Sequence, residues 1–282
     1  MTELTNTPEN NRLTLNPMAP TNHIFDYHGT PVSYQVIGEG KPLIQLHGWG
    51  SSSRVMVPVA KQLQAVCRSL LVDLPGFGNS PEPPQAWAVS DYADMIGAFI
   101  QSTGEKEVDL LVHSFGGRIA LKLLTRKDLS YKIGRVLITG GAGMKPKRPL
   151  SFYFRKYLAR ALKAPLLILP AGLRKIADRH LRKTALWKKL GSPDYRSLTG
   201  IMRETFVKSV TEHLDDLLPE IEHEILLLWG EDDEATPLYQ ARRMEAGLKN
   251  GALVIIDGAG HYAFLDKPKQ FAAIAKAFLK NP

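Results

Sequence analysis

Val-Asp-Leu-Leu-Val-His-Ser-Phe-Gly-Gly, residues 108–117, is the stretch that decides how this chain folds. Its apolar first half is typical of a strand buried on both faces, and its second half favours the start of a helix. A serine on so sharp a turn, Ser114, projects its hydroxyl beyond the edge of a sheet. The turn favours small residues two positions before and after the serine; Gly116 supplies the second, whereas the β-branched Val112 crowds the first. The alternative is that Ser114 only caps the helix.

Short runs rich in Leu, Ile and Val recur along the chain, with helical patterns between them. The predicted strands are 42–47, 69–73, 108–113, 135–139, 224–229 and 252–257, preceded by a hairpin of 24–27 and 32–36. The predicted helices are 53–65, 91–102, 117–127, 238–248 and 268–280, with Ser90 or Asp91 capping the second. This alternation predicts an α/β fold, in which a mostly parallel eight-stranded sheet is flanked by helices.

The composition is that of a globular protein. Hydrophobic residues make up 44% and charged residues 23% of the 282 positions, which excludes a disordered chain. The single cysteine, Cys67, excludes an internal disulfide, and no apolar run approaches the ~18 residues that a membrane helix needs. Residues 1–20 are polar and lack the layout of a signal peptide, so we expect a flexible tail on a cytoplasmic protein that enters no membrane.

The excess positive charge lies in one segment. Residues 141–220 hold 17 Lys and Arg against 7 Asp and Glu, whereas the remainder holds 19 against 21. This segment has no clear strand and contains helical patterns at 152–163, 174–189 and 194–208, so it predicts a basic helical cap inserted into a core of 21–140 and 221–282. Nucleic-acid binding is the alternative, but no zinc-finger or RNA-binding motif accompanies the charge, and we expect a solvated outer face instead.

Two later strands end in residues that could activate a serine. The strand 225–229 is followed by four adjacent carboxylates, Glu231 to Glu234, and the strand 253–256 is followed by Gly260 and His261. A serine hydroxyl becomes nucleophilic when a histidine takes its proton, and a carboxylate orients that histidine. Because parallel strands end at one edge of a sheet, these groups are predicted to meet beside Ser114.

Five motifs in this order give the chain a family resemblance. It resembles the α/β-hydrolase fold superfamily, in the small serine-esterase-like branch with a helical cap. The matching pieces are Leu46-His47-Gly48-Trp49-Gly50, Asp73-Leu74-Pro75-Gly76-Phe77-Gly78-Asn79-Ser80, His113-Ser114-Phe115-Gly116-Gly117, Trp229-Gly230-x-x-Asp233-x-x-x-Pro237 and Gly260-His261. They span most of the chain and are more specific for the fold than for a substrate.

The resemblance implies a role for each site residue. Ser114 is the expected nucleophile, His261 the base and Asp233 the orienting acid, with Asp232 as the alternative acid. The backbone N–H groups of Trp49 and Phe115 are the expected oxyanion donors. Of the other histidines, His113 is expected to pack under the turn and His47 to hold the first loop. We assign no chemistry to the segment 73–80.

The expected activity is hydrolysis of short- to medium-chain carboxylic esters through an acyl-enzyme. The alternatives are carbon–carbon bond hydrolysis of ring-fission products by the same residues, and a non-catalytic or slow-turnover binding protein. We expect a small-molecule ester substrate, no metal, nucleotide or other cofactor, and either a monomer or a homodimer. Apolar cap residues could line an acyl pocket or form the cap's own core: Phe152, Tyr153, Phe154, Tyr157, Leu166, Leu167, Ile168 and Leu169.

Overall fold

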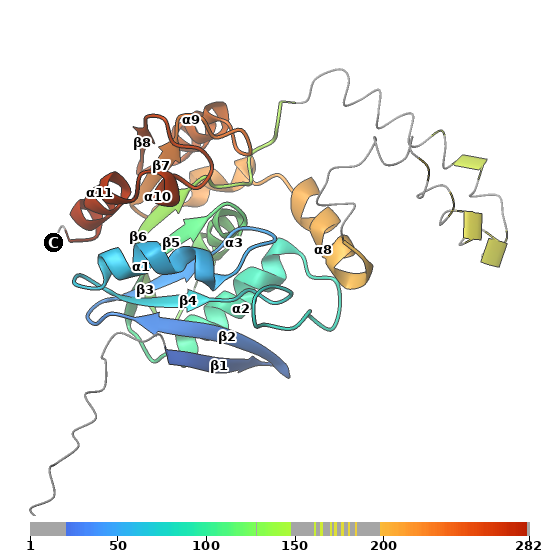
Figure 1. Ribbon diagram of the computed structural model, residues 1–282, viewed down its shortest axis with the longest axis horizontal. Coiled ribbons are helices and arrows are strands. Elements are labelled where there is room, and N and C mark those ends of the chain that lie inside the picture. The colour runs from blue at the N-terminus through green and yellow to red at the C-terminus, as the bar shows by residue number, and fades with distance from the viewer. Residues whose placement is uncertain are drawn as a thin grey trace, which may run out of the picture.

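The computed structural model describes residues 21–127, 129–147 and 198–280, with scattered positions between 161 and 184. One sheet holds eight strands in the order β1-β2-β4-β3-β5-β6-β7-β8 (Figure 1). β1 pairs with β2, and β2 with β4, in antiparallel fashion, and all other pairs are parallel. The predicted fold is therefore confirmed. The strands are β1 (Thr21–Tyr27), β2 (Thr30–Ile37), β3 (Pro42–Leu46), β4 (Arg68–Val72), β5 (Glu107–His113), β6 (Lys132–Thr139), β7 (Ile225–Gly230) and β8 (Gly251–Ile256).

Helices cover both faces of the sheet, and successive strand residues feed two separate cores. Leu43 of β3 joins the core beneath η1 (Ser53–Met56), α1 (Val57–Leu63), α10 (Ala263–Asp266) and α11 (Pro268–Lys280). Its neighbour Ile44 joins the core beneath α2 (Val89–Ser102), α3 (Phe115–Leu124), η3 (Asp215–Glu220) and α9 (Leu238–Gly247). This alternation explains why the central strands read as continuous apolar runs, since side chains on both faces are buried.

The start of α2 differs from its prediction. Ala88 is the N-cap residue, and the Asp91 carboxylate accepts a hydrogen bond of 2.6 Å from the Ala88 N–H. Asp91 therefore caps the helix from inside its first turn, where a negative charge also suits the helix dipole. Neither Ser90 nor Asp91 stands at the cap position itself.

The inserted segment leaves and rejoins the core at one place. The Leu214 N–H donates to the Gly143 carbonyl at 2.9 Å, and the Lys145 N–H donates to the Asp215 carboxylate, also at 2.9 Å. Between these ends, α8 (Gly200–Thr211) is the helix that the structure describes as a whole. The tail 1–20, the helical patterns 152–163 and 174–189 and the apolar cap residues named above lie outside the described residues, apart from a few scattered positions.

Side chains of α8 fix this helix on the core. The Thr205 hydroxyl accepts a hydrogen bond of 3.1 Å from the Trp87 N–H, and the Lys208 ammonium donates to the Ala86 carbonyl at 2.6 Å. The buried Met202 side chain lies directly against the Cα of Gly76. Among the described helices, none is both long and apolar enough to cross a membrane.

Candidate active site

Ser114 stands in a strained turn between β5 and α3. Its φ of 51° and ψ of −107° lie outside the regions that non-glycine residues ordinarily adopt, at a cost of about 1–3 kcal/mol. The surrounding backbone holds the turn: the Ser114 N–H donates to the Thr139 carbonyl at 3.1 Å, and its carbonyl accepts from Gly117 and Ala142 at 2.9 and 3.0 Å. Such strain, held by neighbouring hydrogen bonds, is typical of a functional position.

Two glycines allow other segments to approach this turn closely. A Cβ on Gly116 would lie 2.8 Å from the Leu46 Cβ and 2.9 Å from its carbonyl oxygen, so only glycine lets α3 approach β3 this closely. A Cβ on Gly48 would lie 3.0 Å from the Ser114 Cβ. Val112, the β-branched residue two positions before Ser114, is fully buried in the core.

Asp233 and His261 are joined by hydrogen bonds at the ends of β7 and β8. The His261 Nδ1 lies 2.9 and 3.1 Å from the two oxygens of the Asp233 carboxylate. The Asp233 side chain is fully buried, whereas the His261 side chain is 18% exposed. The same carboxylate accepts the Thr236 N–H at 2.8 Å and lies within 2.8 Å of the Thr236 hydroxyl.

These contacts keep Asp233 ionised. Burial alone would raise the pKa of this carboxyl, but the hydrogen bonds from His261 and Thr236 outweigh burial and hold its pKa below the ordinary value. A carboxylate at Nδ1 fixes the neutral imidazole as the tautomer with its proton on Nδ1. The Nε2 lone pair is then free to accept a proton.

Several short contacts bring His261 and Ser114 to the same edge of the sheet. The Thr139 carbonyl binds the Ser114 N–H, and the next residue, Gly140, touches His261: a Cβ there would lie 2.9 Å from the His261 Nδ1. In the described part of the chain, neither the Ser114 Oγ nor the His261 Nε2 has a hydrogen-bond partner. Catalytic hydrogen bonds are often long in ligand-free enzymes and shorten when substrate binds.

His113 supports the loop that carries His261, a contact that the sequence did not predict. The His113 Nε2 lies 3.0 Å from the His261 carbonyl, to which it donates, and the two rings lie 4.6 Å apart. Complete burial lowers the pKa of His113 to about 3, so this imidazole stays neutral. Its predicted position under the turn is confirmed.

His47 holds the first loop, as predicted. Its Nε2 accepts the Leu74 N–H at 3.1 Å, so its Nδ1 carries the proton and donates to the Gly48 carbonyl at 2.7 Å. Burial lowers the pKa of His47 to about 4, which keeps this arrangement neutral. Trp49 follows directly, and its ring packs edge-on against Phe115, with ring centroids 5.2 Å apart.

Trp49 and Phe115, the residues whose N–H groups are the expected oxyanion donors, follow the ends of β3 and β5, and their rings are in contact. No described residue accepts a hydrogen bond from the Trp49 N–H. Phe115 is the first residue of α3, where a helix leaves its N–H groups without internal acceptors. The helix start adds partial positive charge at the place where an oxyanion would form.

The four adjacent carboxylates, residues 231–234, differ in how deeply they are buried. Asp233 is 3% exposed and is the one in contact with His261. Glu231, Asp232 and Glu234 are all exposed, and the Glu231 carboxylate accepts the Gly258 N–H at 3.2 Å. Asp232, the alternative acid, therefore does not reach the imidazole. Among the described residues, no group of three or more His, Cys, Asp or Glu is placed to hold a metal ion.

A cavity of about 420 Å³ opens beside Trp49. Trp49, Phe77 and Met202 give it apolar walls, and Met202 comes from α8 of the inserted segment. Glu82 is the one charged residue among those that line it in the described part of the chain. The cavity can therefore hold an apolar group next to the proposed oxyanion donor.

Comparisons with known proteins agree with this geometry. A sequence profile of the alpha/beta hydrolase family matches residues 46–274. The pimeloyl-(acyl-carrier protein) methyl ester esterase of Neisseria meningitidis is 27% identical over 260 residues, 86% of this chain and 77% of that protein. An esterase from Exiguobacterium antarcticum has a TM-score of 0.68 at 22% identity, covering 90% of this chain and 97% of that one. A meta-cleavage product hydrolase from Pseudomonas fluorescens has a TM-score of 0.64 at 18% identity, covering 89% and 94%. The profile covers most of the sequence, so this chain belongs to the alpha/beta hydrolase family.

Proposed function

We propose that this protein is a serine carboxylesterase that cleaves short- to medium-chain esters through an acyl-enzyme on Ser114. The observation that carries the proposal is the strained Ser114 turn at the same sheet edge as the His261–Asp233 pair. A serine that only capped its helix would have no need of a buried carboxylate and a free imidazole nitrogen nearby. The Ser114 side chain makes no capping hydrogen bond to the backbone of α3, which also argues against that alternative.

The first half of the reaction forms the acyl-enzyme. The Ser114 Oγ attacks the ester carbonyl carbon while the His261 Nε2 takes the serine proton, and the carbonyl oxygen becomes an oxyanion. The Trp49 and Phe115 N–H groups stabilise this oxyanion, and each such donor contributes about 10²–10³ in rate. His261 then gives its proton to the leaving alcohol oxygen, and the carbon–oxygen bond of the ester breaks.

The second half releases the acid. A water molecule attacks the acyl carbon, His261 takes its proton, and the proton then returns to the Ser114 oxygen as the carboxylic acid leaves. In both halves His261 becomes an imidazolium beside an ionised Asp233. Because the pKa of Asp233 is held low, this carboxylate stays charged and stabilises the imidazolium.

The cavity beside Trp49 favours an uncharged acyl group. Trp49, Phe77 and Met202 line it together with the polar Thr199, and Glu82, the one charged residue among its described lining residues, would repel an anionic substrate. Ring-fission products are acids, so this lining favours ester hydrolysis over carbon–carbon bond hydrolysis. The relative named as a methyl ester esterase also supports this choice, whereas the solved structures of this fold include both esterases and meta-cleavage product hydrolases. We further propose that 141–220 forms a cap that closes over this edge, with Met202 as the part of it that reaches the cavity.

The test is turnover of p-nitrophenyl esters, from acetate to laurate, by wild type, Ser114→Ala and Ser102→Ala. Ser102 lies on the exposed end of α2 and serves as the matched control. We expect Ser114→Ala to lose at least about 10³-fold in kcat with unchanged circular dichroism, and Ser102→Ala to behave as wild type. Retained turnover in folded Ser114→Ala would contradict the proposal. Ring-fission products belong in the same panel, and faster turnover of these acids would favour the carbon–carbon alternative.

A further inference from the structure

His113 lies at the point where three segments of the candidate site meet. It directly precedes Ser114 in the chain, and its Nε2 lies 3.0 Å from the carbonyl oxygen of His261. Its ring also lies against the first loop, because a Cβ on Gly48 would be 3.0 Å from the His113 Nδ1. Trp49, one of the expected oxyanion donors, follows Gly48 in the chain. One buried side chain therefore contacts the loops of the proposed base and of one oxyanion donor, and it stands next to the nucleophile.

The contacts of this imidazole fix which of its nitrogens carries the proton. A carbonyl oxygen can only accept a hydrogen bond, so the Nε2 that faces His261 carries the proton of the neutral ring. The Nδ1 is then an acceptor, and no described residue donates to it. Burial lowers the pKa of His113 to about 3, so the ring is a poor acid and a poor base near neutral pH. His113 can therefore hold a neighbour in place without exchanging protons with it.

The position of the His261 main chain decides how far its imidazole reaches toward Ser114. Asp233 holds the ring itself, through Nδ1 at 2.9 Å. Two described side chains hold the main chain: the exposed Asp266 carboxylate accepts the Gly260 N–H at 2.8 Å, and the buried His113 donates to the His261 carbonyl. Water competes less with a buried donor, so the contact with His113 is the stronger of the two restraints.

We propose that His113 is a positioning residue, whose hydrogen bond to the His261 carbonyl sets the distance between the Ser114 Oγ and the His261 Nε2. This inference rests on the proposed esterase function and deepens it. Because residue 113 precedes the nucleophile, its side chain ties the loop of the base to the turn that carries Ser114. A misplacement of ~1 Å in a reacting group can lower the rate about 10²-fold, so this one contact affects kcat.

The test compares His113→Phe with His113→Gln in the turnover of p-nitrophenyl butyrate. Phenylalanine keeps a flat ring but has no donor, whereas glutamine carries an amide N–H about as far from the main chain as Nε2. For His113→Phe we expect kcat per folded molecule to fall about 10- to 100-fold, with KM within about 3-fold of wild type. His113→Gln should restore kcat to within about 5-fold. Packing alone predicts the opposite order, since phenylalanine fills the space of the ring better than glutamine.

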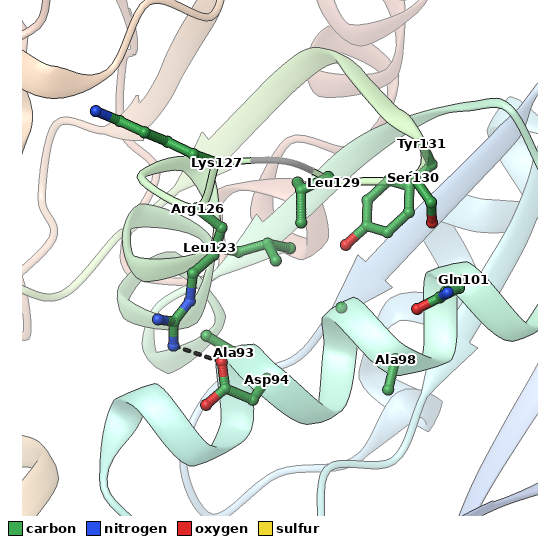
Figure 2. A pocket seen from close by; sticks show the side chains of 11 residues that line it. Ala93, Asp94, Ala98, Gln101, Leu123, Arg126, Lys127, Leu129, Ser130 and Tyr131 are labelled. Atoms are coloured by element: carbon green, nitrogen blue, oxygen red, sulfur yellow. Dashed lines mark hydrogen bonds and ion pairs between the residues drawn. The ribbon is translucent and has the colours of Figure 1, made fainter.

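Leu123→Ala is the control for a general loss of stability. Leu123 is buried near the far end of α3, in the groove drawn in Figure 2, and a ten-residue helix is about 15 Å long. Loss of this side chain should lower the urea midpoint and leave kcat per folded molecule unchanged. A fall in kcat of equal size in Leu123→Ala and His113→Phe, or a His113→Gln no more active than His113→Phe, would overturn the proposal.

Fluorophosphonate labelling distinguishes a failure of this inference from a failure of the proposed function. A wild-type protein that is not labelled contradicts the proposed function and this inference with it. If wild type is labelled on Ser114 and His113→Phe is labelled as fast, the positioning role alone is wrong. We also expect the NMR spectrum of protein with ¹⁵N-labelled histidine to show His113 as the Nε2–H tautomer at neutral pH. The Nδ1–H tautomer would contradict the inference, because its Nε2 has no proton to donate.

Discussion

Two buried carboxylates at the same edge of the sheet have different hydrogen-bond partners. Asp73 follows β4 and is 1% exposed, and Asp233 follows β7 and is 3% exposed. Asp73 accepts backbone N–H groups from Ser53 at 2.6 Å and Asn79 at 2.9 Å. Asp233 instead accepts the imidazole of His261, in addition to bonds from its own loop.

The difference lies in what each carboxylate holds in place. Asp73 joins the loop after β3 to the loop after β4, and all of its side-chain partners in the described chain are backbone groups. Asp233 holds a side chain that can carry a proton. Position at a strand end and burial are common to both, so the partner alone separates the structural carboxylate from the one to which we propose a catalytic role.

The largest effect is expected from Asp233→Asn. The amide keeps the shape but favours the wrong imidazole tautomer, so kcat for p-nitrophenyl esters should fall about 10³–10⁴-fold. Thermal unfolding monitored alongside should also show some loss of stability, because this buried carboxylate accepts the Thr236 N–H in addition to His261. An activity within 10-fold of wild type would remove Asp233 from its role.

The matched variant Asp73→Asn should show the opposite pattern. Its amide group cannot accept both backbone N–H groups, and a buried donor left unpaired costs about 1–3 kcal/mol. We expect a loss of that size in the free energy of unfolding, measured in urea, with kcat per folded molecule within a few-fold of wild type. A large loss of kcat at full stability would mean that the two carboxylates do not differ as described.

Thr236→Val should give the smallest effect and sharpen the comparison. It removes the hydroxyl beside the Asp233 carboxylate but keeps the backbone N–H bond, so the pKa of Asp233 should rise toward its ordinary value. Because the pKa of Asp233 is lower in the folded protein than in the unfolded chain, the ionised carboxylate stabilises the fold at pH values above its ordinary pKa. This stability is lost as the pH falls through the lowered pKa of the folded protein. We expect kcat to fall less than about 10-fold near neutral pH. In urea unfolding across pH, the part of the acid-induced loss of stability that comes from Asp233 should be smaller than in wild type and should be complete at a higher pH. A pH profile of stability identical to that of wild type would contradict this account of the hydroxyl.

The sequence predicted the strands, most helices and the meeting of three strand ends, because buried parallel strands have continuous apolar runs. The position of Asp233 in the family motif selected it as the orienting acid from four adjacent carboxylates. The structure distinguishes the same residue from its neighbours by its burial. The start of α2 was missed because Asp91 acts from inside the first turn.

The role of His113 could not be read from the sequence. Its hydrogen bond reaches the carbonyl of a residue 148 positions away, and no local pattern encodes such a contact. This contact follows from packing between elements and not from the periodicity of any one of them.

The most direct test of the central claim is covalent labelling with a fluorophosphonate, which reacts with an activated serine and needs no assumption about substrate. Intact-protein mass spectrometry should show one phosphonyl group, and peptide mapping should place it on Ser114. Ser114→Ala and His261→Ala should not be labelled, whereas Ser102→Ala should be labelled as fast as wild type. Absence of labelling in the wild-type protein, which would favour a non-catalytic binding protein, or a label on another serine would contradict the account.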